Sequence, residues 1–134
     1  MISYWFYKIS EAVALLIPLR LAYALAKILS GIYYIFAFRD RRMVTDNLKV
    51  IFPLKGDREI AVIRFRVFRN FAKYLVDFLR FKKLDKKYIS EKVKIINMES
   101  VQEGLSRGNG VILLTAHLGN WELGGMVISQ LGYS

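Results

Sequence analysis

Apolar side chains dominate residues 1–38, and only a few charged residues interrupt them. The longest uncharged run, Ile28 to Phe38, is shorter than the roughly 18 to 20 residues of a plain transmembrane helix. Arg20 and Lys27 share one helical face, so their long side chains can extend to an interface. Pro18 is expected to kink the helix or divide it in two. The pattern predicts a membrane-anchoring helical region, tilted or lying in the interface; an ordinary pair of buried helices is the alternative.

Residues 39–91 keep a helical period but carry many more charges. A short helix is predicted over 41–52, ending before Pro53. Asp57 can cap a long helix that runs to about Phe81. Its apolar positions recur at helical spacing and form one stripe, which comprises Ile60, Ile63, Val67, Phe71, Leu75 and Phe78. The segment is therefore expected to form basic amphipathic helices.

From residue 92 the pattern changes to alternating strand and helix signals. Strands are predicted at 92–97 and 110–116, and the second is an almost unbroken apolar run of the kind found where both faces of a sheet are covered. Between them, Ser100 and Glu103 have the spacing of a capping box and open a short helix that ends at Gly108.

A last helix is expected after the second strand. Asn120 or Gly119 can cap its start, and Gly132 ends it after about Leu131. The predicted fold class is therefore α/β, with amino-terminal membrane-associated helices followed by a β-α-β-α unit of parallel strands. Because the chain stops where a third strand is expected, the sheet is expected to be truncated. The predicted organisation is a membrane-anchoring region at 1–38, basic helices at 39–91 and the first part of a catalytic domain at 92–134.

Composition narrows the class of partner. The 134 residues are 54% hydrophobic and carry a formal net charge of +10. The basic charge is concentrated in residues 39–94, with seventeen basic and seven acidic side chains. A membrane is the simplest surface that is both apolar and anionic. Nucleic acid is not favoured, because the charge adjoins the apolar region and no recognised binding motif accompanies it.

The candidate chemistry lies in TAHLGNWE, residues 115–122, which holds the only histidine of the chain. With His117 in a turn and Glu122 in the first helical turn, the carboxylate can accept a hydrogen bond from one ring nitrogen. The other nitrogen can then take a proton from a substrate hydroxyl, as a general base. This dyad needs no cofactor, and His-x4-Glu alone supplies too few ligands for a metal site. The absence of cysteine excludes a cysteine nucleophile and thiolate metal sites.

These residues also admit a purely structural interpretation. A lone histidine near a strand end is commonly a satisfied structural residue. Gly119 and Asn120 can be only a helix cap, and Trp121 only a core aromatic.

The same stretch resembles a known family. His117-Leu-Gly-Asn-Trp-Glu122 resembles the H-x4-D/E motif of the glycerolipid (lysophospholipid) acyltransferase superfamily, in the form seen in the lipid A lauroyl and myristoyl acyltransferases. Gly119, Asn120 and Trp121 support the motif. The segments 47–53, 69–74 and 108–115 also resemble that family, so the resemblance extends over nearly all of the chain. The chain resembles the amino-terminal portion of the family's proteins.

The resemblance implies an O-acyltransferase that moves a fatty acyl chain from a carrier thioester to a hydroxyl of a membrane lipid of the lipid A precursor type. His117 would be the general base, and Glu122 would orient it and stabilise its charge. The donor would be acyl carrier protein or acyl-CoA. The resemblance also implies the bacterial inner membrane, with a glycerolipid-acyltransferase-like sheet and an active site on the cytoplasmic side. Later family motifs would lie beyond Ser134, so this chain alone is expected to be inactive.

Two alternatives stay open. The same chemistry can act on a lysophospholipid or a glycosylated phospholipid, because the motif serves the base and not the lipid headgroup. A non-catalytic basic membrane-binding module would explain the charge, but it would leave His117 and Glu122 without a role.

Overall fold

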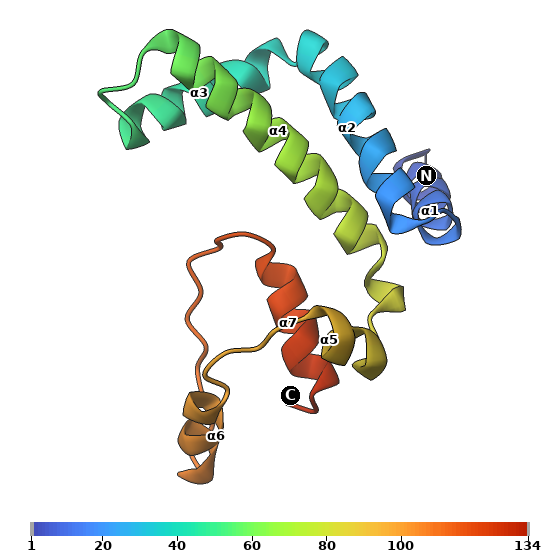
Figure 1. The fold of residues 1–134 in the computed structure, drawn as a ribbon, viewed down its shortest axis with the longest axis vertical. Helices are drawn as coiled ribbons and strands as arrows, with labels where there is room; N and C mark the ends of the chain where they lie inside the picture. The colour runs from blue at the N-terminus through green and yellow to red at the C-terminus, as the bar shows by residue number, and fades with distance from the viewer. Residues whose placement is uncertain (1, 134) are drawn as a thin grey trace. The chain divides into compact units, whose positions relative to one another are not determined.

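The computed structural model describes residues 2–133, and the regular elements in this range are all helical (Figure 1). The chain divides into two compact units, Met1–Arg80 and Phe81–Ser134. The first unit contains α1 (Ile2–Leu16), α2 (Leu19–Phe36), α3 (Phe38–Ile51) and α4 (Asp57–Leu79). The second contains a short 3-10 helix (Phe81–Lys83), α5 (Lys86–Lys92), α6 (Glu99–Ser106) and α7 (Trp121–Gln130).

Proline and packing against α4 define the first unit. Pro18 is the N-cap residue of α2, which confirms that it divides the apolar region into two helices. α4 packs against α2 most extensively and also against α3 and α1. On the predicted stripe, Ile60 is only 1% exposed, whereas Phe71 is 58% exposed. The apolar stripe is therefore covered at its start and partly open further along.

The carboxyl-terminal end of α1 is held by a side chain from the end of α4. Arg80 donates hydrogen bonds to the carbonyl oxygens of Ala14 and Ile17, the latter at 2.9 Å. These carbonyls lie at a helix end, where backbone acceptors lack partners within the helix and a positive charge is favourable. The Tyr23 hydroxyl donates to Asp77 nearby, so α1 and α2 are both fixed to the last turns of α4.

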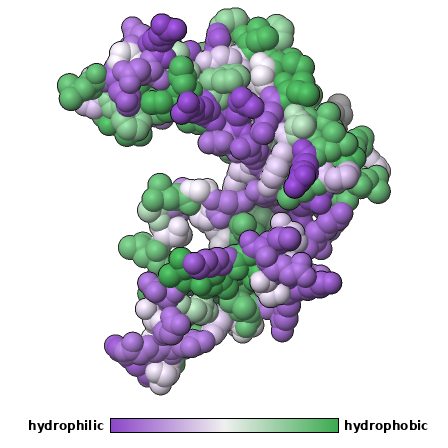
Figure 2. All heavy atoms as spheres, viewed as in Figure 1, coloured by the Kyte–Doolittle hydropathy of each residue, from purple (hydrophilic) through white to green (hydrophobic). Residues whose placement is uncertain are grey.

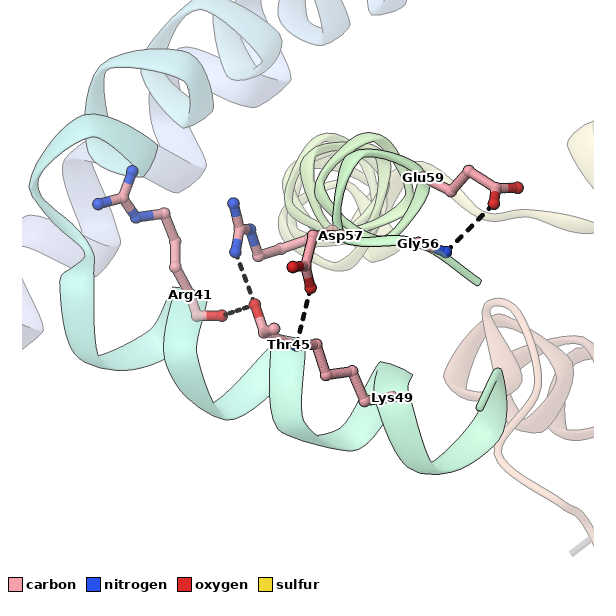
Figure 3. Close-up of polar contacts among 7 residues, drawn as sticks. Arg41, Thr45, Lys49, Gly56, Asp57 and Glu59 are labelled. Atoms are coloured by element: carbon pink, nitrogen blue, oxygen red, sulfur yellow. Dashed lines mark hydrogen bonds and ion pairs between the residues drawn. The ribbon is translucent and has the colours of Figure 1, made fainter. Parts of the chain in front are cut away.

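Ion pairs close the connection between α3 and α4, and Figure 3 shows the one between Lys49 and Asp57. Lys49 Nζ lies 2.8 Å from Asp57 Oδ1, and Lys55 Nζ lies 3.0 Å from Glu59 Oε1. Glu59 also accepts a hydrogen bond from the Gly56 backbone N–H at 3.3 Å. The N-cap of α4 lies one residue before the predicted position: Gly56 is the N-cap, and Asp57 is the first helical residue.

These contacts predict a loss of stability in acid. The Lys49 hydrogen bond, followed by its charge, lowers the pKa of Asp57, and the Lys55 hydrogen bond is the largest cause that lowers the pKa of Glu59. Because both folded pKa values lie below the unfolded ones, the stabilisation is complete above the ordinary values and is lost as pH falls through the folded values. NMR titration of the carboxyl groups should show the depressed pKa values, and Lys49→Met should return that of Asp57 towards its ordinary range. A pKa of Asp57 that does not respond to Lys49→Met would contradict this assignment.

The predicted β-α-β-α unit is wrong for the residues that the structure describes. α5 ends at Lys92, and the segments 93–97 and 110–118 form no strand and share no backbone hydrogen bonds. Ile112 and Leu114 are 96% and 98% exposed. Alternating or continuous apolar residues favour extended backbone, but a strand needs a ladder partner, and a two-stranded pair alone is only marginally stable in water. The α/β fold class predicted from the sequence is therefore replaced by an all-helical one.

The helices predicted in this unit are present, although one cap differs. Met98, not Ser100, is the N-cap of α6, and no side chain caps it. Asn120 caps α7 as expected, because its Oδ1 accepts a hydrogen bond from Leu123 N at 3.1 Å. A Cβ atom added at Gly104 would lie 2.7 Å from a methyl group of Val111. The extended segment therefore approaches α6 closely at a position where only glycine leaves room.

Candidate functional site

A tight turn carries the chain from the extended segment into α7. His117 and Gly119 both have left-handed backbone conformations, with φ of 53° and 67°. The Thr115 hydroxyl oxygen accepts a hydrogen bond from the His117 backbone N–H at 3.3 Å. Asn120 then starts the helix as its N-cap. Together these local contacts fix the position of His117 immediately before the helix that carries Glu122.

The backbone of His117 is unusual for a residue with a side chain. Positive φ values are uncommon outside glycine, although histidine tolerates them better than most residues. The left-handed conformation costs roughly 1–2 kcal/mol. Such strain persists where the surrounding structure holds it, and it is concentrated at functional sites.

The structure brings His117 together with Trp121. Their ring centroids are 4.3 Å apart, with an angle of 58° between the ring planes. His117 is nevertheless an exposed residue, so its ring contacts Trp121 and remains accessible to a ligand. No hydrogen bond joins His117 to Glu122 within residues 2–133.

Glu122 occupies the first turn of α7 and is half-buried. Its Oε2 atom is buried and has no hydrogen-bond partner in the described part of the chain. A carboxylate near a helix N-terminus is stabilised by the helix dipole, but a buried oxygen without a donor costs free energy. The arrangement therefore provides an acceptor that an N–H donor can satisfy, and the imidazole of His117 lies only five positions before it in the sequence.

The part of the chain that the structure describes contains no candidate metal-binding cluster. No group of three or more His, Cys, Asp or Glu side chains is placed to hold a metal ion there. The site therefore rests on one imidazole, one carboxylate and one indole.

The sequence pattern assigned no role to Thr115 and treated Trp121 only as motif support. Regular helical spacing does not predict the ring contact, because His117 precedes α7 and has a left-handed φ of 53°. The hydrogen bond from His117 N to Thr115 Oγ1 likewise depends on the conformation of the turn.

The first unit exposes many large apolar side chains. Within the described residues, α2 (Leu19–Phe36) is long and apolar enough to cross a membrane, and only 6% of that window is buried. Figure 2 shows hydrophobic side chains gathered over α1 and α2. Length and composition alone support this description of the helix.

Comparison with known families identifies the chain. Residues 1–133 match the family described as bacterial lipid A biosynthesis acyltransferase, and the matched range includes the turn with His117 and Glu122. No curated protein and no solved structure matches the chain. The resemblance of the HLGNWE segment and its neighbours to this family is thereby confirmed. The chain belongs to the bacterial lipid A biosynthesis acyltransferase family.

Proposed function

We propose that the protein transfers a fatty acyl chain from a carrier thioester to a hydroxyl group of a membrane lipid of the lipid A precursor type, with His117 as the general base. Membership of the acyltransferase family supports the reaction class. The observation that carries the assignment of residues is the buried Oε2 of Glu122, which has no hydrogen-bond partner among the described residues. Glu122 lies on the first turn of the helix that follows an exposed histidine. An orphaned acceptor of this kind is explained if it receives a hydrogen bond from the imidazole during the reaction.

In the proposed reaction, one ring nitrogen of His117 takes the proton of the acceptor hydroxyl. The hydroxyl oxygen bonds to the thioester carbonyl carbon and forms a tetrahedral oxyanion. The C–S bond then breaks, an ester remains, and the leaving thiolate takes the proton from the imidazolium. Glu122 stabilises the imidazolium by charge and by a hydrogen bond to the second ring nitrogen. Catalytic hydrogen bonds are often long or poorly aligned without substrate, so this role requires the imidazole to turn towards Glu122 when substrate binds.

Trp121 limits the rotation of the imidazole through the ring contact described above. Gly119 permits the left-handed turn, and Asn120 fixes the start of α7. These three residues are therefore proposed as supports for the dyad and not as groups that touch the reacting atoms. No cofactor or metal is required for this chemistry.

The acyl donor is proposed to be acyl carrier protein, with acyl-CoA as the alternative. An acidic carrier suits the basic residues between Arg64 and Lys94. The acceptor is proposed to be a lipid A precursor, with a lysophospholipid or a glycosylated phospholipid as the alternative. The protein is proposed to act at the bacterial inner membrane on its cytoplasmic side, held by α1 and α2.

The test of this function is acyl transfer by the full-length enzyme in detergent. Acyl carrier protein or CoA loaded with a labelled chain would be mixed with a lipid A precursor or a lysophospholipid, and mass spectrometry would follow the new ester. Transfer from the carrier protein to the lipid A precursor is expected to be the fastest combination. Absence of transfer in every combination, with membrane binding retained, would instead support the non-catalytic membrane module.

The lysines of the second unit are expected to contribute to binding of anionic surfaces. Replacing Lys82, Lys83, Lys86 and Lys87 by Gln should weaken binding to anionic liposomes, because each charge near such a surface contributes on the order of 1 kcal/mol. The effect should be larger at low ionic strength, where screening is weaker. A liposome sedimentation assay at two salt concentrations would measure it. Binding at low salt that matches the unsubstituted chain would mean that these lysines only face solvent.

A further inference from the structure

Two arginines from different helices lie over the ring of Tyr34 in the first unit. The guanidinium carbon of Arg41, on α3, is 5.1 Å from the ring centroid, and that of Arg64, on α4, is 5.6 Å away. Arg64 Nε donates to the Tyr34 hydroxyl at 2.8 Å, and its Nη1 donates to Thr45 Oγ1 at 2.6 Å. Thr45 in turn donates to the Arg41 carbonyl oxygen at 2.7 Å (Figure 3). Hydrogen bonds to Tyr34 and Thr45 thus fix the Arg64 guanidinium before any ligand binds. The Arg41 guanidinium is held by its contacts with the rings of Tyr34 and Phe38.

The charges of these arginines are not neutralised by the protein. Neither Arg41 nor Arg64 forms an ion pair within residues 2–133, and the hydrogen-bond acceptors of Arg64 are uncharged. Both side chains are half-buried, so their mutual repulsion is screened less than on an open surface. The planar guanidinium group presents paired N–H donors that match the oxygens of a phosphate. The pair therefore has the charge and the donors of a phosphate site.

An apolar groove lies in the same unit. It has a volume of about 890 Å³ and is lined by side chains of α1, α2 and α4, with two from α3. This volume lies within the ~300–1,000 Å³ of ordinary ligand pockets. Its lining is almost wholly apolar and includes Ile9, Val13, Leu25, Leu29, Phe71 and Leu75. A hydrocarbon chain is the ligand chemistry that such a lining favours.

The groove and the arginine pair meet at Phe68. This residue lines the groove and packs edge-to-face on the Tyr34 ring, with centroids 5.1 Å apart. Tyr33, beside Tyr34, also lines the groove, and so does Asp40, which accepts a hydrogen bond from the Tyr33 hydroxyl. Among the described residues that line the groove, Asp40 is the one acidic residue. A bound anion at this end therefore needs the positive charges of both arginines to exceed the negative charge of Asp40.

The position of this junction along the chain suits a lipid headgroup. Tyr34 lies in the last turn of α2, the helix long and apolar enough to cross a membrane. Arg41 and Arg64 therefore stand near the end of an apolar helix, where phosphate groups of a bilayer would begin.

We propose that the first unit binds one membrane glycerophospholipid, with an acyl chain in the groove and its phosphate diester between Arg41 and Arg64. No bond is made or broken at this site, which is separate from the proposed reaction at His117. The bound lipid would hold α2, α3 and α4 together by covering their open apolar surface and by neutralising the two arginines.

The proposal is tested by measuring lipid bound to the full-length protein in mild detergent by native mass spectrometry. Phosphatidylglycerol and diacylglycerol of equal chain length would be titrated separately. The variant Arg41→Gln/Arg64→Gln should reduce phosphatidylglycerol occupancy by roughly tenfold or more, because hydrogen bonds between charged groups are lost. The control Arg58→Gln/Arg66→Gln removes two exposed arginines of α4 and should retain the occupancy. Diacylglycerol, which has no phosphate, should bind weakly and should not distinguish the variants.

Two further variants keep the test decisive if the arginine variant folds poorly. Asp40→Asn removes the opposing charge and should raise phosphatidylglycerol occupancy. Ala26→Phe fills the groove and should lower it, whereas Ile28→Phe, on the exposed face of the same helix, should not. Equal losses in both arginine variants, or diacylglycerol binding as tight as that of phosphatidylglycerol, would overturn the proposal. His117→Ala should leave lipid occupancy unchanged, so failure of this site and failure of the proposed reaction are distinguishable.

Discussion

His117→Ala is expected to lower acyl transfer by the full-length enzyme about 10²- to 10⁴-fold, the usual contribution of a general base. Without the imidazole, the acceptor hydroxyl keeps its proton and attacks the thioester poorly. Glu122→Gln keeps the size of the side chain but removes the charge that stabilises the imidazolium, so it should also lose much of the rate. Because the two residues act as a unit, the double variant should be little slower than His117→Ala alone. The assay follows a labelled acyl chain from the carrier to the lipid.

A matched substitution separates the chemistry from the backbone. His117→Gly also removes the imidazole, but glycine adopts φ near 53° without the cost that alanine pays there. It should therefore be as inactive as His117→Ala while unfolding at an equal or higher temperature. Transfer at a near wild-type rate by either variant would exclude His117 as the base. Loss of folding in both would show that the residue is structural.

Charges on the exposed face of α2 are expected to abolish membrane binding. Ile28, Ile32 and Ile35 are 61%, 52% and 58% exposed and do not line the groove. Their replacement by Asp leaves the contacts with α4 intact but places three carboxylates in the apolar phase. Each such charge costs about 2.5–3.5 kcal/mol at a helix centre, so the triple variant should move from the membrane fraction to the supernatant. Sedimentation after cell lysis measures this distribution.

The control for this experiment uses equally exposed apolar residues outside α1 and α2. Met43, Val50 and Ile51 on α3 are 55%, 82% and 64% exposed, and their replacement by Asp should affect membrane binding much less. A high-salt wash should not release the unsubstituted chain, because burial of apolar surface is not screened as surface charge is. Complete release by salt would show that the association is electrostatic and that α2 is not embedded.

Local signals predicted the helices well. The break at Pro18, the helix before Pro53, the long helix after Gly56 and the Asn120 cap of α7 all depend on residues close together in the sequence. The prediction of a strand at 110–116 was wrong, because a strand depends on a partner segment elsewhere in the sequence. An apolar run such as Val111 to Leu114 favours extended backbone, but only a distant segment can supply the hydrogen bonds of a sheet, and local sequence does not specify that partner.

In the candidate site, too, the sequence predicted which residues are involved but not the contacts between their side chains. Motif spacing and family resemblance led to His117 and Glu122, which the structure places on the two sides of one helix start. The hydrogen bond expected between them is not formed within the described residues, and the imidazole contacts Trp121 instead. Side-chain rotamers depend on packing and ligands, which motif spacing does not contain. The left-handed φ of His117 could be anticipated only from the following Gly119, whose presence suggests a tight turn.

The hydrogen bonds from Arg80 to Ala14 and Ile17 have a consequence for the order of folding. They join residues 66 and 63 positions apart, so the last carbonyls of α1 acquire their partner only after the whole of α4 has been synthesised. Contacts of such long sequence separation form late, because the entropy of closing the loop is lost before the contact forms. On the ribosome, the end of α1 should therefore remain frayed and accessible to chaperones until Arg80 emerges, and its docking should complete the first unit.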